Sequence, residues 1–220
     1  MNEYSNSPLV ADLAKHCRDE ATMNHKCIYF ITTTYLDSLA APLTAYSATN
    51  RLDKFHKAFL SRLFRTRHFN RPTVRNNEPT LYCYLDAPAS KKKTTNQKRT
   101  NHSSDNAFHH HCIVIADESL ALKLNALCDK TNAAGFVEEH QSRIRLRTLD
   151  VQRVPNALSD LLKVCDYATD FYTKQIRFPR NDVSHDDLLT VFPKSSSEFQ
   201  GGKTHQTHQR KPAQSHYAQA

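Results

Sequence analysis

Runs of β-branched and aromatic residues, each bounded by polar residues, predict β-strands over residues 27–35, 80–86 and 108–116. A further segment, residues 142–149, alternates between arginine and apolar side chains. Alternation of this kind is typical of a strand with one buried face, because successive side chains of a strand point to opposite sides. We therefore expect four strands from the pattern alone.

Helices are predicted where apolar residues recur every three or four positions. This spacing occurs in residues 51–67, 117–130 and 156–175, and a short extra element is expected within 182–193. The resulting order is strand, helix, strand, strand, helix, strand, helix. It predicts an α+β fold in which an antiparallel sheet of four to five strands carries helices mainly on one face, of the ferredoxin-like type.

The ends of the chain and one internal segment differ in composition from the rest. Residues 1–26 are expected to form an N-terminal extension and residues 27–193 a single domain. Residues 87–107 contain almost no apolar side chains and predict a mobile basic loop within that domain. Residues 194–220 are rich in Ser, Gly, Gln, His and Lys and predict a disordered tail.

Composition narrows the function classes. The 220 residues carry a net charge of +8, which favours a polyanionic partner because lysine and arginine release counterions from phosphates. The six cysteines are widely spaced and form no CxxC pair, which indicates reduced thiols rather than a disulfide framework. We see neither a signal peptide nor a membrane span in the sequence, so we expect a cytoplasmic protein without a membrane partner.

Two histidines in the strand 108–116 form the first chemical signal. His109 and His111 share one face of a strand and lie about 6.5–7 Å apart along it, whereas His110 points to the other face. Two imidazoles at this spacing can bind one cation. A polar strand end with a fortuitous histidine run is the alternative for this pattern taken by itself.

The helix predicted over 156–175 supplies the second signal. On a helical wheel, Tyr167 lies among charged side chains, and Lys174 follows two turns later on the same face. A lysine beside a tyrosine favours the phenolate and can also hold a phosphate. Tyr172 falls on the apolar side and is expected in the core. An ordinary amphipathic helix with a solvent-facing polar side is the alternative.

These motifs, in this order, resemble the HUH endonuclease superfamily, and in particular its Rep-type proteins, which initiate rolling-circle replication. The triplet His109-His110-His111 resembles the motif histidine, bulky residue, histidine. The segment CIYFITTTY is similar to the first-strand motif of the Rep branch, TLYCYLD and FHHHCIVIA are similar to its central hairpin, and DYATDFYTK is similar to its tyrosine motif. The resemblance spans about residues 27–175.

The resemblance implies metal-dependent nicking and rejoining of single-stranded DNA through a 5′-phosphotyrosine. His109 and His111 would hold Mn²⁺ or Mg²⁺, with Asp86 as the third ligand because it ends the strand before the loop that leads to His109. Glu78 and Asp170 are weaker candidates for that ligand. Because the middle residue is also a histidine, the metal pair is open to a shift by one position.

Tyr167 is the expected nucleophile, Lys174 would stabilise developing charge, and Tyr172 remains the second candidate nucleophile, because the position three after Tyr167 is an aspartate. The expected partners are single-stranded DNA or a DNA hairpin at an origin, and a host helicase and polymerase. Basic residues are candidates for the DNA path. They are Arg62, Arg65, Arg143, Arg145, Arg147, Lys91, Lys92 and Lys93.

Other functions remain open at this stage. A transposase or relaxase of the same superfamily would use the same chemistry for a different process. A non-catalytic nucleic-acid-binding module could keep the same sheet. A structural zinc site joining the histidines to a cysteine such as Cys112 is disfavoured, because structural zinc ligands usually come in short spaced sets.

Overall fold

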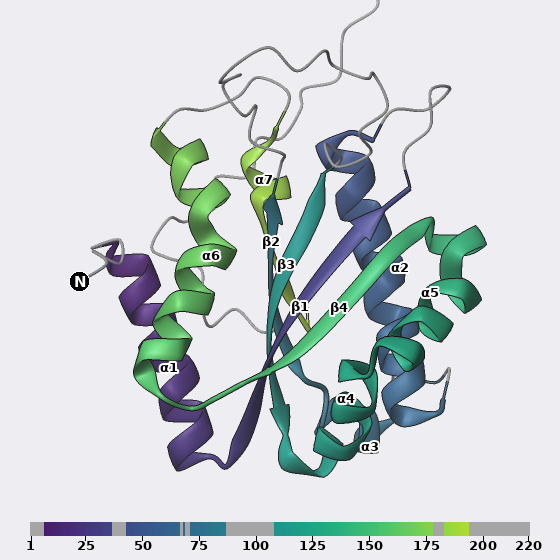
Figure 1. Cartoon of the computed structure of the whole chain (residues 1–220), viewed down its shortest axis with the longest axis horizontal. Coiled ribbons are helices and arrows are strands. Elements are labelled where there is room, and N and C mark those ends of the chain that lie inside the picture. Colours follow the sequence, from purple (N-terminus) through teal and green to yellow (C-terminus); the bar gives the residue numbers. More distant parts are fainter. Residues whose placement is uncertain are drawn as a thin grey trace, which may run out of the picture.

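A five-stranded antiparallel sheet forms the centre of the molecule (Figure 1). The computed structural model describes residues 7–36, 43–66, 68, 71–86, 108–177 and 183–193. The strand order is β4-β1-β3-β2-β5, so the strand with the histidine triplet lies in the middle. The strands are β1 (Lys26–Tyr35), β2 (Thr80–Asp86), β3 (His109–Asp117), β4 (Leu146–Val154) and β5 (Leu189–Phe192).

Helices cover both faces of the sheet. In Figure 1, α1 and α6 lie together on one side of the sheet, and α2, α4 and α5 lie on the other. The helices are α1 (Pro8–Met23), α2 (Ala45–Phe64), α3 (Pro72–Arg75), α4 (Ala121–Cys128), α5 (Lys130–Ile144), α6 (Leu158–Arg177) and α7 (His185–Leu188), with a 3₁₀ turn at Glu118–Leu120 before α4. The predicted α+β class and antiparallel sheet are confirmed. The expectation that helices lie mainly on one face needs correction, because α1 and α6 cover the second face.

Two hydrophobic cores result, one on each face of the sheet. Side chains alternate along β1, so Tyr29 and Ile31 enter the core under α2, α4 and α5, whereas Ile28 and Phe30 enter the core under α1 and α6. All four side chains are at most 7% exposed. Burying such a side chain stabilises the fold by about 1.5–3 kcal/mol, so both helical layers are integral to the domain.

Helix α1 was not predicted, and residues 1–26 were expected to lie outside the domain. Residues Val10, Leu13 and Cys17 are at most 1% exposed, and α1 packs against α6 and β1. The domain therefore includes α1. Its apolar stripe contains alanine and cysteine among longer side chains, which weakens the periodic signal.

The predicted strand over 142–149 is wrong at its beginning. Helix α5 continues to Ile144, and Arg145 adopts a left-handed conformation with φ of 58° that ends the helix. Strand β4 then begins at Leu146 and runs to Val154. The alternating pattern therefore arises from the last turn of a helix followed by a strand, with Ile144 and Leu146 both buried. The three arginines consequently do not share one strand face.

Side-chain hydrogen bonds at their N-termini explain why α2 and α5 begin where they do. The Thr44 side chain accepts a hydrogen bond from the Ser47 N–H, and the Ser47 hydroxyl oxygen accepts one from the Thr44 N–H. The Asp129 carboxylate accepts from the N–H groups of Thr131 and Asn132. Each such cap contributes about 1 kcal/mol by satisfying N–H groups that have no partner within the helix.

Candidate metal centre

The β2–β3 hairpin brings Asp86 opposite His109. The two strands pair antiparallel, with Asp86 aligned to His109 and Tyr84 to His111. Because side chains two apart on a strand share a face, His109 and His111 both lie on the side of Asp86. Residues 87–107, for which a mobile basic loop was predicted, come between these strands in the sequence and lie outside the described residues.

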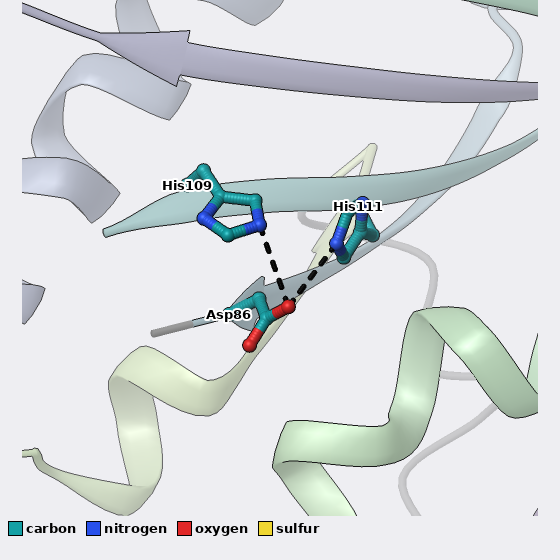
Figure 2. A group of neighbouring side chains, drawn as sticks. All are labelled: Asp86, His109 and His111. Atoms are coloured by element: carbon teal, nitrogen blue, oxygen red, sulfur yellow. Dashed lines mark hydrogen bonds and ion pairs between the residues drawn. The ribbon is translucent and has the colours of Figure 1, made fainter. Parts of the chain in front are cut away.

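The carboxylate lies between the two imidazoles (Figure 2). Asp86 Oδ2 is 3.4 Å from His109 Nε2 and 3.2 Å from His111 Nε2. The ligand atoms of the three side chains all lie within 4.8 Å of one another. Adjacent ligands of an octahedral ion with bonds of about 2.2 Å are about 3.1 Å apart, close to both of these separations. The group can therefore hold a metal ion.

The burial and the charges of these three side chains favour metal binding. The side chain of His111 is 1% exposed, whereas those of His109 and Asp86 are 19% and 27% exposed, so the group opens to solvent on one side. Burial acts to raise the pKa of Asp86, but hydrogen bonds from His109 and His111 and their charges outweigh it and hold the pKa well below its usual range. The carboxylate is thus ionised and available as a ligand.

Thr32 of β1 holds the ring of His111 from the other side. Thr32 pairs with His111 in the β1–β3 register, and its Oγ1 lies 3.1 Å from His111 Nδ1. When Nδ1–H donates to this oxygen, His111 can release the Nε2 proton that bonds to Asp86, and the lone pair of Nε2 is then available to a metal ion. The ring of Phe30 stacks on His111 at 5.5 Å between centroids. Sequence reasoning missed both neighbours, although a threonine two positions after a core phenylalanine in the adjacent strand was a usable signal.

Tyr167 of α6 lies beside the same histidine. Its ring centroid is 4.7 Å from that of His111 and 5.9 Å from that of Phe30. Tyr167 is 59% exposed, so its ring covers the site while remaining accessible. Sheet and helix thus bring together the four residues for which metal binding and nucleophilic attack were expected, namely Asp86, His109, His111 and Tyr167.

The other two residues predicted on α6 lie elsewhere. Tyr172 is half-buried and packs edge-on against Tyr84 at 5.8 Å between ring centroids, within the core. Lys174 is exposed and forms an ion pair with Asp170 one turn earlier. The Asp170 carboxylate, a weaker candidate for the third ligand, is thereby engaged on the helix surface.

The neighbour His110 points to the opposite face of the sheet. It is fully buried, and its Nδ1 lies 3.1 Å from the hydroxyl of Tyr35, which also accepts a hydrogen bond from Thr33. Burial, reinforced by the charges of His109 and His111, lowers the pKa of His110 to about 3. His110 therefore cannot share an ion with its two neighbours.

Two alternative ligands are also placed away from the group. Cys112 is buried in the core under α2, α4 and α5, where it pairs across the strands with Cys83, so it cannot join the histidines in a zinc site. Glu78 pairs instead with His56, with Oε1 3.3 Å from Nε2. In the parts of the chain that the structure describes, Asp86, His109 and His111 form the one group of three or more metal-ligating side chains.

The predicted DNA-contacting residues are scattered. Arg62 of α2, Arg65 after it and Arg143 of α5 line one cleft on the face opposite the metal group. Arg147 lies in β4, and Arg145 occupies the turn between α5 and β4. The lysines Lys91, Lys92 and Lys93 lie outside the described residues.

Comparison with known proteins identifies no relative. No protein-family model matches the chain, and no significantly similar curated protein or solved structure was found. Within the described ranges, no helix combines the length and apolar character needed to cross a membrane. The cysteines are all free thiols, five of them buried and Cys128 partly so.

Proposed function

We propose that this protein nicks and rejoins single-stranded DNA, with Tyr167 as the nucleophile beside a divalent cation bound by Asp86, His109 and His111. The observation that carries the proposal is the position of Tyr167, whose ring contacts His111 of the metal group. Two histidines and one carboxylate also occur in non-haem iron enzymes, so the donor set alone would not select this function. The resemblance of the sequence motifs to the HUH endonuclease superfamily supports the same assignment.

The proposed chemistry is a reversible transesterification, in which phosphorus exchanges its bond to a 3′ oxygen for a bond to the tyrosine oxygen. The phenolic oxygen of Tyr167 attacks phosphorus and loses its proton to water, which reaches this exposed side chain. A new bond forms between the tyrosine oxygen and phosphorus while the bond from phosphorus to the 3′ oxygen breaks, and that oxygen takes a proton to become a 3′-hydroxyl. The phosphotyrosine retains the bond energy, so attack by a 3′-hydroxyl rejoins the strand and releases Tyr167.

Mn²⁺ or Mg²⁺ is the proposed ion. When bound, it supplies positive charge that polarises the scissile phosphate. These ions suit a site with few protein ligands, because substrate phosphate oxygens complete their coordination. The exposed side of the group leaves room for such a phosphate, and Asp86 contributes the charge that neutral imidazoles lack.

Lys174 is proposed to neutralise phosphate charge next to the reacting group. It lies seven residues after Tyr167, about 10 Å along the helix axis and on a similar face. In the structure its charge is paired with that of Asp170, and an incoming phosphate would compete for it. Its effect on the reaction is therefore expected to be smaller than that of Tyr167.

The biological setting that we propose is initiation of rolling-circle replication of a phage, plasmid or other mobile element in the cytoplasm, with a host helicase and polymerase as partners. Transposition or conjugative transfer would use the same chemistry. A DNA hairpin at an origin is the proposed recognition element. A non-catalytic nucleic-acid-binding role is the competing function.

Formation of a covalent adduct tests the chemistry. A single-stranded oligonucleotide library with a randomised core and a 3′ label would be incubated with the protein and Mn²⁺ or EDTA. We expect a labelled species that survives denaturing electrophoresis and requires Mn²⁺, because the downstream strand stays attached to the tyrosine. The released strand should be extendable by a polymerase, since it ends in a 3′-hydroxyl.

Matched variants assign the nucleophile. Tyr167→Phe and His111→Ala should abolish the adduct, whereas Tyr46→Phe, which alters a 70% exposed tyrosine on α2, should not. Loss of the adduct in Tyr172→Phe with retention in Tyr167→Phe would move the nucleophile to the second tyrosine. DNA binding without any adduct in the wild-type protein would leave only the non-catalytic role.

A further inference from the structure

A basic cleft lies on the face of the sheet opposite the metal group. It has a volume of about 590 Å³ and is bounded by α2, α4 and α5. Two alanines, Ala58 and Ala126, leave space between the helices. The charged and polar side chains that line it are Lys57, Ser61, Arg62, Arg65, Lys123, Glu139, His140 and Arg143.

Positive charge exceeds negative charge in this cleft, because five cationic side chains line it beside one carboxylate. In the described part of the chain, no salt bridge is formed by Lys57, Arg62, Arg65 or Arg143. The single acidic side chain, Glu139, is 61% exposed and lies 3.8 Å from a histidine of the same cleft. Five cations facing one carboxylate repel one another, and this cost is relieved when an anion enters.

The pKa of His140 is affected by the positive charges of the same cleft. Its ring packs on Phe136 at 4.6 Å between centroids. Burial lowers the pKa of His140, and the positive charges of Arg143 and Arg62 lower it further, against the opposing effect of Glu139. Side chains from α2 and α5 therefore converge on one point.

The arrangement along α2 suits an extended polyanion. Lys57 and Arg65 are eight residues apart, so the basic side chains extend over about 12 Å of the helix. Phosphates of one strand of a duplex recur about every 3.4 Å along the axis, so this length matches three or more of them. A single phosphate would engage only part of the set.

The cleft lacks the features that bind unpaired bases. Among the described residues that line it, His140 is the one aromatic side chain. Proteins that bind single strands rely on aromatic rings to stack the bases. A base-paired segment presents its phosphates while its bases remain stacked inside. Recognition by cations alone therefore favours a duplex.

We propose that this basic cleft binds the phosphate backbone of a base-paired DNA segment, separate from the single strand at the metal group. The choice of DNA rests on the proposed function, whereas the preference for a paired backbone rests on the charges and lining of the cleft. The helices that bound the cleft, α2, α4 and α5, lie on one side of the sheet, and α6 with Tyr167 lies on the other (Figure 1). One protein can therefore hold a paired segment on one face and an unpaired strand on the other.

Binding to a labelled 20-base-pair duplex, measured by fluorescence anisotropy in EDTA, tests this proposal without requiring cleavage. The double variant Arg62→Ala/Arg143→Ala removes two cleft charges, and Lys15→Ala/Arg18→Ala removes two charges from the surface of α1 as the matched control. Circular dichroism and melting temperature check that both variants are folded. A single strand of equal length provides the comparison ligand.

We expect the cleft variant to lose about tenfold or more in duplex affinity at 0.1 M salt, because two phosphate contacts are lost. The slope of log Kobs against log salt should become shallower by about 2. The control variant should stay within about twofold of the wild type.

Equal losses in the two variants would overturn the proposal, as would absence of duplex binding or a cleft-dependent preference for the single strand. The experiment distinguishes failure of this inference from failure of the proposed function. Cleft-dependent duplex binding without any adduct would retain this inference and remove the nicking activity. An adduct without cleft-dependent duplex binding would retain the nicking activity and remove this inference.

Discussion

His110 lies in the sheet interior without access to water, and this burial should make the stability of the protein depend on pH. The pKa of His110 is lowered from 6.5 to about 3 in the folded protein, with burial as the main cause. Between these two values the unfolded chain binds a proton that the folded chain excludes. The free energy of unfolding therefore falls as the pH falls through 6.5, and the loss continues until the pH approaches 3.

The expected magnitude follows from the two pKa values. Protonation of the unfolded state stabilises it by about 0.2 kcal/mol at pH 7 and by about 2 kcal/mol at pH 5, whereas the folded state gains almost nothing at either pH. His110 alone should thus remove about 2 kcal/mol of stability between pH 7 and pH 5. That is a substantial part of the 5–15 kcal/mol typical of a domain.

Urea unfolding of wild type and His110→Phe, followed by circular dichroism at pH 7 and pH 5 in EDTA, isolates this contribution. The variant lacks the titrating ring, and its loss of the hydrogen bond with Tyr35 is the same at both pH values. We expect the wild type to lose about 2 kcal/mol more than the variant over this range. Equal losses in both proteins would refute the assignment of His110 as a buried neutral histidine.

Three further outcomes are expected. Thr32→Val should weaken Mn²⁺ binding about 10- to 100-fold in titration calorimetry, because the His111 ring loses its orienting partner. The control Thr34→Val, two residues along the same strand face, removes a hydroxyl that bonds to Thr148 instead and should leave Mn²⁺ binding unchanged. Saturation with Mn²⁺ at about 100 times its Kd should stabilise the wild type by about 2.7 kcal/mol, and an unchanged melting temperature would contradict metal binding. Phe136→Ala should cost about 3–5 kcal/mol in urea unfolding because the side chain is 1% exposed, whereas Leu122→Ala, at 83% exposure, should change stability by less than about 0.5 kcal/mol.

Local sequence patterns predicted the elements that carry the metal group. The strands expected over 80–86 and 108–116 agree with β2 and β3 to within one residue, because β-branched and aromatic runs bounded by polar residues leave little ambiguity. Alternation along β3 was enough to separate His110 from its two neighbours. The helical wheel likewise separated exposed Tyr167 from Tyr172, which packs in the core.

Patterns failed where two elements adjoin or where an apolar stripe uses small side chains. Ile144 and Leu146 are both buried and two residues apart, as in a strand, yet a left-handed Arg145 between them ends a helix and begins β4. A periodicity of two over so few residues does not distinguish these cases. The stripe of α1 includes Ala14 and Cys17, whose burial becomes visible only through packing against α6.

By itself, then, the sequence determined the three central strands β1, β2 and β3, the face on which each histidine of the triplet lies and the side of α6 that carries Tyr167, because all of these follow from periodicities within one element. Only the tertiary structure decided which helices cover which face of the sheet. That placement brings Tyr167 to His111 and gathers Arg62 and Arg143 in a cleft on the other side. The physical reason is that such contacts join segments far apart in the chain, and their energies arise from burial and charge once the whole sheet has formed.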